Sequence, residues 1–139
     1  MATTIRPELS KRNRYWISKH RYYELKHFCL QYPGWLKAYK ELVVYGVSVS
    51  NITNEFRSTE ISDPTAKIAI LKMHCTERIE MIEKAAMETD EYLYKYIIAA
   101  VTEGRSYVYL KSRLDIPCSR DTFYDRYRKF FWLLSQKRQ

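Results

Sequence analysis

The chain has 139 residues, 46% of them hydrophobic, which is enough for one domain or for one small domain with an appendage. No run approaches the ~20 apolar residues of a membrane span and no signal-peptide pattern is present, so we expect a cytoplasmic protein with no membrane partner. Its 24 Lys and Arg against 16 Asp and Glu give a formal net charge of +8, which favours a polyanionic partner such as nucleic acid.

The basic charge gathers at the two ends of the chain. The first 26 residues hold seven Lys and Arg against two acidic residues, and the last 36 hold nine against three. The stretch between them holds eight against eleven. We interpret residues 1–17 as a flexible basic arm, because its first 14 residues show no apolar periodicity. Within this arm Lys11, Arg12 and Arg14 are expected to contact phosphates.

Few glycines and prolines, together with apolar residues at helical spacing, predict an all-α fold. Residues 18–62 are expected to hold a pair of helices followed by a loop. The first helix spans Ser18 to Gln31 with Ser18 as its N-cap, and the second runs from Pro33-Gly34 to about Tyr45. Residues 46–62, rich in Ser, Thr, Asn and β-branched residues, predict a loop with or without a short strand.

Residues 63–139 are interpreted as a helical hairpin scaffold that carries a C-terminal helix-turn-helix. Its first helix begins at Asp63-Pro64 and ends near Met87. The helix has a narrow apolar stripe formed by Ile68, Leu71, Cys75, Ile79, Ile82 and Ala86. Such a stripe fits either a packed hairpin inside one monomer or a seam for self-association, and both interpretations stay open. A further helix, capped by Thr89 or Asp90, is expected to end at Gly104.

Residues 106–137 carry the pattern of a helix-turn-helix. A short apolar helix capped by Ser106 packs Tyr107, Leu110 and Leu114 inward. A tight turn at Asp115-Ile116-Pro117 follows, and Ser119 then caps a longer basic helix. Two helices in this order, the second of them basic, are typical of a DNA-reading element.

The longer helix divides into a core face and a polar face. The core face is expected to hold Phe123, Tyr127, Phe130, Phe131 and Leu134. Base contacts are expected from the N-terminal half of the helix, at Arg120, Thr122, Tyr124, Asp125 and Arg128. Phosphate contacts are expected from Arg126 and Lys129. The alternative is that these side chains form an ordinary solvated helix face.

The segment from Leu114 to Lys129 resembles a known family. Leu114-x-Ile116, followed by Thr122-Phe123-Tyr124-x-Arg126-x-Arg128-Lys129, is similar to a pattern of phage late-transcription regulators of the RinA/ArpU-like families. These are related to the region-4 helix-turn-helix of sigma factors. Residues 63–135 as a whole also resemble small uncharacterised proteins of Gram-positive phages and prophages. Asp115 departs from the pattern, since glycine is common there.

The resemblance implies a phage or prophage transcription regulator that binds double-stranded DNA sequence-specifically in the cytoplasm of a bacterial host cell. It also implies a homodimer and contact with RNA polymerase. Two alternatives remain open: a DNA-packaging subunit similar to a small terminase, which assembles as a ring, and a protein-binding module that captures a host factor such as RNA polymerase.

Catalytic and metal chemistry find little support in the sequence. His27-x-Cys29 and His74-Cys75 offer zinc ligands, but zinc sites show tighter paired spacing, and both cysteines fall on apolar stripes that predict buried thiols. Nucleotide-binding loops and nucleophile elbows are not found in the sequence. We therefore expect no enzyme, cofactor, metal or small-molecule substrate.

Overall fold

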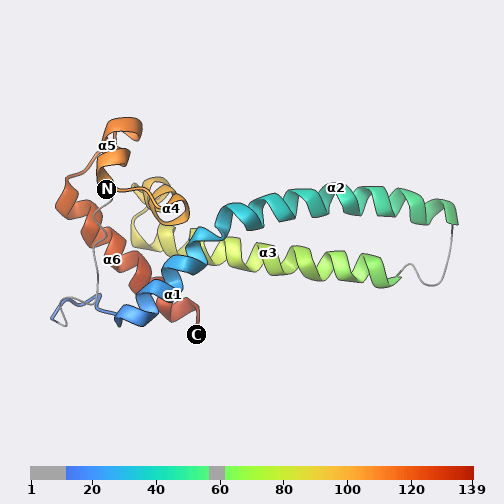
Figure 1. Ribbon diagram of the computed structural model, residues 1–139, viewed down its shortest axis with the longest axis horizontal. Helices are drawn as coiled ribbons and strands as arrows, with labels where there is room; N and C mark the ends of the chain where they lie inside the picture. Colours follow the sequence, from blue (N-terminus) through green and yellow to red (C-terminus); the bar gives the residue numbers. More distant parts are fainter. Residues whose placement is uncertain (1–11, 57–61) are drawn as a thin grey trace. The chain divides into compact units, whose positions relative to one another are not determined.

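The computed structural model describes residues 12–56 and 62–139, with side chains described for residues 12–44 and 64–139 (Figure 1). All the regular structure in these ranges is helical, which confirms the all-α class. The helices are α1 (Lys19–Leu30), α2 (Tyr32–Phe56), α3 (Ser62–Thr89), α4 (Tyr94–Glu103), α5 (Tyr107–Leu114) and α6 (Arg120–Lys137). Within these ranges no helix is both long and apolar enough to cross a membrane.

The chain divides into two compact units. Residues 1–32 and 81–139 form the first unit, and residues 33–80 form the second. The boundary therefore falls at the start of α2 and inside α3. The first helix thus groups with the C-terminal helices, although the sequence analysis placed it with the second helix.

The core of the first unit is built where α1 meets α4 and α6 (Figure 1). The predicted stripe of α1, which includes Tyr22, Leu25 and Phe28, is buried. The Tyr22 ring stands edge-on to Phe131 of α6, with ring centroids 5.1 Å apart, and its hydroxyl lies 2.7 Å from that of Tyr127. The buried hydroxyl pair satisfies two polar groups that would otherwise destabilise the core.

Local capping determines where several helices begin and end, as the sequence predicts. The Ser18 side chain accepts a hydrogen bond from the Arg21 N–H at the start of α1. Gly104 ends α4 with φ +68°, a left-handed conformation that glycine adopts without a Cβ penalty.

The helix expected from Asp90 onward begins in a turn. The Asp90 Oδ1 accepts the N–H groups of Tyr92 and Leu93 at 2.8 and 3.0 Å, and the regular helix α4 starts at Tyr94. Thr89 is not the cap: its buried hydroxyl donates to the carbonyl of Ala85 at 2.7 Å. Asp90 therefore caps the turn that leads into α4, whereas Leu93 at the N-cap position of α4 makes no side-chain cap.

In the second unit, α2 and the first part of α3 run in opposite directions (Figure 1). The prediction of a loop over residues 46–62 is wrong for residues 46–56, because α2 continues to Phe56. Residues 57–61 lie outside the described residues. Val, Ile, Ser, Thr and Asn lower helix stability by only a few tenths of a kcal/mol each, and no proline interrupts this stretch. The helix that begins before residue 46 can therefore continue to Phe56.

The apolar stripe of α3 is buried over most of its length. Ile68, Cys75, Ile82 and Ala86 are buried, whereas Leu71 is 48% exposed, so one member of the predicted seam faces outward. Cys29 is buried as well, as the sequence analysis expected of both thiols. Burial raises the pKa of the Cys29 thiol well above its usual value. No cluster of three metal-ligating side chains occurs within the described ranges.

Candidate nucleic-acid interface

Capping of α5 and a backbone hydrogen bond fix the turn between α5 and α6. The Ser106 side chain accepts the Tyr109 N–H at the start of α5, and Asp115 ends the helix in the left-handed region, at φ 51° and ψ 51°. Aspartate tolerates this conformation better than most residues. The Ile116 N–H then donates to the carbonyl of Leu110 at 3.2 Å, which carries the fully buried Ile116 side chain into the core.

Leu114 was expected to pack inward, but it is 44% exposed. Leu114 is the last residue of α5, and the chain turns at the left-handed Asp115 directly after it. Because the chain turns at Asp115, Ile116 takes the inner position instead. The turn thus substitutes one apolar side chain for another and leaves Leu114 at the surface.

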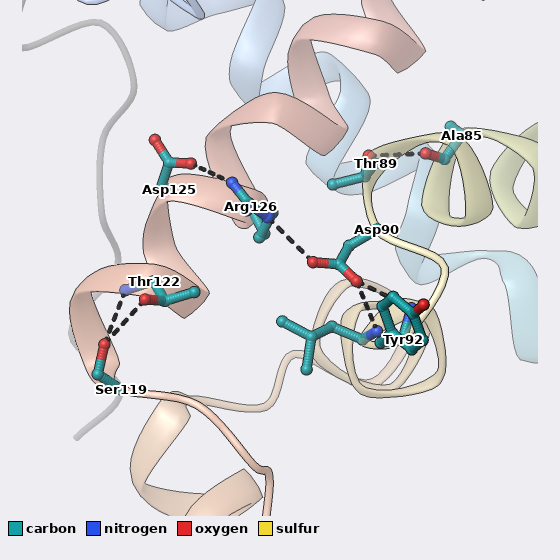
Figure 2. Close-up of polar contacts among 9 residues, drawn as sticks. Ala85, Thr89, Asp90, Tyr92, Ser119, Thr122, Asp125 and Arg126 are labelled. Atoms are coloured by element: carbon teal, nitrogen blue, oxygen red, sulfur yellow. Dashed lines mark hydrogen bonds and ion pairs between the residues drawn. The ribbon is translucent and has the colours of Figure 1, made fainter.

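The start of α6 is fixed by its cap and by one aromatic contact. Ser119 Oγ accepts the Thr122 N–H at 3.2 Å and lies 3.0 Å from the Thr122 hydroxyl (Figure 2). The Phe123 ring packs on Tyr107 of α5, with centroids 5.9 Å apart. The Tyr107 hydroxyl donates to the carbonyl of Cys118 at 2.6 Å. These contacts determine the angle between α5 and α6.

The buried face of α6 is wider than predicted. All five expected core residues are buried, and Tyr124, expected to read bases, is buried as well, with 5% exposure. Its ring stands edge-on to Phe123 and Tyr127, at centroid distances of 5.0 and 6.0 Å. This burial makes Tyr124 a weaker candidate for base contact than the sequence suggested. An aromatic side chain at the edge of the core gains more by burial than by exposure.

Arg126, expected at phosphates, lies between two carboxylates. Its Nε is 3.1 Å from the Asp90 Oδ2 and its Nη1 is 2.6 Å from the Asp125 Oδ2 (Figure 2). The side chains of Asp90 and Arg126 are 16% and 32% exposed. Asp90 therefore caps the turn before α4 with one oxygen and holds α6 with the other. Sequence reasoning found the cap but missed the ion pair, because its partners lie 36 residues apart.

The charges of this cluster stabilise one another. Burial alone would raise the pKa of the Asp90 carboxyl, but the Tyr92 and Leu93 N–H groups and the Arg126 guanidinium together lower it below its usual value. The hydrogen bond to Asp90 raises the pKa of Arg126 in turn. Arg126 and Asp125 are thus engaged inside the protein, which makes both weaker candidates for DNA contact than the sequence suggested.

The end of the predicted arm is packed rather than free. Tyr15 and Ile17 are buried, and the Tyr15 ring lies 5.5 Å from that of Trp132 on α6. The Tyr15 N–H donates to the Asn13 side chain at 2.8 Å, which holds the chain in a turn. The expectation of a flexible segment is wrong for residues 12–17, since two large apolar side chains anchor it. Lys11 lies outside the described residues.

Arg12 and Arg14 are both exposed, and the packing of Tyr15 brings Arg14 beside α6. Arg14, Arg126 and Lys129 line a shallow hollow of about 600 Å³. Glu88, Asp90 and Glu91 line it too, so cations and anions are balanced there. The hollow alone does not select an anionic ligand.

Apart from Arg126, four cations of α5 and α6 form no ion pair with a carboxylate among the described residues. They are Arg113, Arg120, Arg128 and Lys129. The Arg120 guanidinium lies 5.6 Å from the centroid of the Tyr124 ring, a distance at which a ring attracts a cation. Thr122, two residues further along α6, is exposed as well.

Comparisons with protein-family models, with curated proteins and with solved structures find no match for this chain.

Proposed function

We propose that the protein binds double-stranded DNA through α5, the turn and α6, used as a helix-turn-helix, and acts as a sequence-specific transcription regulator of a phage or prophage. One observation carries the proposal: two capped helices, joined by a turn bonded on both sides, present unpaired cations on their exposed side. A reading element needs a rigid turn, because base contacts require a fixed docking angle.

The roles follow from exposure and from position along α6. Arg120 and Thr122 stand in the first turn, the part of a reading helix that meets base edges, and Arg can pair bidentately with guanine. Arg128, Lys129 and Arg113 take phosphates. Tyr124 instead supports Arg120 from below through its ring. Arg126 holds α6 against the start of α4 through Asp90.

The distribution of charge supports this assignment to the first unit. Residues 33–80 hold six Lys and Arg and six Asp and Glu, so they carry no net charge. The whole net charge of +8 therefore belongs to the first unit, which contains α5 and α6. Counterion release from a duplex is driven by such a concentration of Lys and Arg.

Binding is tested by fluorescence anisotropy with a random-sequence duplex across a salt series. We expect Arg113→Ala with Arg128→Ala to weaken binding at least tenfold and to reduce the salt slope by about two, one for each lost phosphate contact. The matched control is Lys37→Ala with Lys40→Ala, which removes two exposed cations from α2. This control should bind as the wild type does. No duplex binding by the wild type at low salt would refute the proposal.

Sequence specificity needs a separate experiment. Selection of bound duplexes from a random pool should enrich one motif, and Arg120→Ala should relax the preference at one position of it. A steep salt dependence without any enriched motif would mean phosphate binding only. In that case the regulator assignment fails although DNA binding stands.

A further inference from the structure

Large apolar side chains lie at the surface of the second unit. On α3, Ile70 is 60% exposed, Leu71 48% and Met73 57%, within a stretch of four residues. Tyr39 and Val43 of α2 are each 37% exposed. Single exposed apolar residues are ordinary, but several in one short stretch mark a surface that another molecule covers. We call these five residues the apolar surface.

The net charge of the second unit limits which kind of partner can cover this surface. The unit carries no net charge, so it offers no general attraction to nucleic acid and no general repulsion to another copy of itself. The first unit, at +8, repels its counterpart in a second copy. Residues 33–80 are therefore the part of the chain through which two copies can associate at the least electrostatic penalty.

The order of charges along α3 fits a second copy in the opposite direction. Lys67 and Lys72 precede Met73, and Glu77, Arg78 and Glu80 follow it, so the residues before Met73 carry a net positive charge and those after it a net negative one. A two-fold axis near Met73 places the lysines of one α3 toward the glutamates of the other, while parallel pairing places like charges together. A two-fold contact uses the same patch on both copies, and a neutral patch with this charge order is self-complementary.

The second unit is large enough to form a stable dimer interface. A stable interface takes about 20–30 residues from each partner, and the second unit contains α2 from Pro33 to Phe56 and α3 from Ser62 to Glu80. We propose that α2 and α3 of a second copy cover the apolar surface, forming a symmetric dimer through residues 33–80. The benefit to DNA reading rests on the proposed function: a two-fold dimer presents two α6 helices to two half-sites.

Sedimentation equilibrium of the full chain at high salt, over a range of concentrations, tests the inference. We expect a mass of twice 16.8 kDa for the wild type. Ile70→Glu with Met73→Glu should shift the chain to the mass of one copy, or raise the dimer Kd at least 100-fold. Both side chains are more than half exposed, so helical circular dichroism of the variant should equal that of the wild type.

The matched control is Val108→Glu, which places the same charge on an exposed apolar residue of α5 in the first unit. It should remain a dimer. At low salt, where the charges are not screened, reversing the lysines with Lys67→Glu and Lys72→Glu should weaken the dimer, and adding Glu77→Lys and Glu80→Lys should restore it. Failure of that rescue would refute the antiparallel arrangement.

Three results would overturn the inference: a single-copy mass for the wild type at 100 μM, a ring of many copies, or an unchanged Kd after Ile70→Glu with Met73→Glu. The two proposals fail separately. A monomer that binds DNA overturns the dimer and leaves the function standing. A dimer that binds no duplex overturns the function and leaves the interface standing.

Discussion

Asp90 gives the sharpest test of how α6 is held in place. Its Oδ1 accepts two N–H groups before α4, and its Oδ2 pairs with Arg126 at 3.1 Å. Asp90→Ala removes both interactions, whereas Asp90→Asn keeps an oxygen for the N–H groups and loses the charge. The two variants therefore separate the capping interaction from the ion pair.

The magnitudes follow from these contacts. Loss of a capping side chain costs about 1 kcal/mol. A hydrogen bond between charged groups contributes ~1.5–3 kcal/mol when buried, and the 32% exposure of the Arg126 side chain lowers this to about 1 kcal/mol. We expect the free energy of unfolding to fall by about 2 kcal/mol in Asp90→Ala and by about 1 kcal/mol in Asp90→Asn.

Urea unfolding followed by circular dichroism measures both losses, and a double-mutant cycle of Asp90→Asn with Arg126→Ala isolates the pair. The cycle should give a coupling energy of roughly 0.5–1 kcal/mol. A coupling below about 0.3 kcal/mol would refute the ion pair. Equal losses in Asp90→Ala and Asp90→Asn would show that the capping interaction contributes nothing.

The pH dependence of stability provides an independent check on Asp90. Its pKa is lower in the folded chain than its unfolded value of about 3.9, so the unfolded chain binds more protons in that window. The stabilisation is thus fully present above about pH 4 to 5 and is lost as the pH falls through the folded pKa. The difference in stability between the wild type and Asp90→Asn should shrink from pH 7 to pH 3, and a constant difference would contradict the assignment.

Two further predictions concern glycine and cysteine. Gly104→Ala should lower the free energy of unfolding by about 1–2 kcal/mol through its φ of +68° alone, since an added Cβ meets only Leu30 Cδ2 at 3.8 Å. Gly34 lies in helix α2, and a Cβ added there would meet nothing within 4 Å, so Gly34→Ala should be neutral or should stabilise the fold by up to about 1 kcal/mol. Equal losses of stability in Gly104→Ala and Gly34→Ala would contradict this explanation. Iodoacetamide at pH 8 should label Cys118 first and Cys29 last, as measured by peptide mass spectrometry, because Cys29 is buried with a raised pKa while Cys118 is partly exposed. Labelling of Cys29 as fast as Cys118 would refute the burial.

Many features of this protein can be predicted from residues that lie close together in the sequence. The caps at Ser18, Ser106 and Ser119 were predictable because a side-chain oxygen and a free N–H only three residues apart need no other part of the chain. The end of α4 at Gly104 follows from one residue's backbone freedom. The core face of α6 follows from the helical period.

Contacts between residues far apart in the sequence were decided by the tertiary structure. Arg126 resembled a phosphate ligand until Asp90, 36 residues away, was found beside it. Tyr124 was expected to contact bases, and only its actual neighbours place it inside the core. The sequence by itself thus determined the all-α class, the helix ends that a local cap or a glycine fixes, and the total charge, because these depend on neighbours along the chain. The extension of α2 to Phe56 did not follow from it. Which cations remain available to DNA depends on pairs brought together by folding, and only the packed structure decides that.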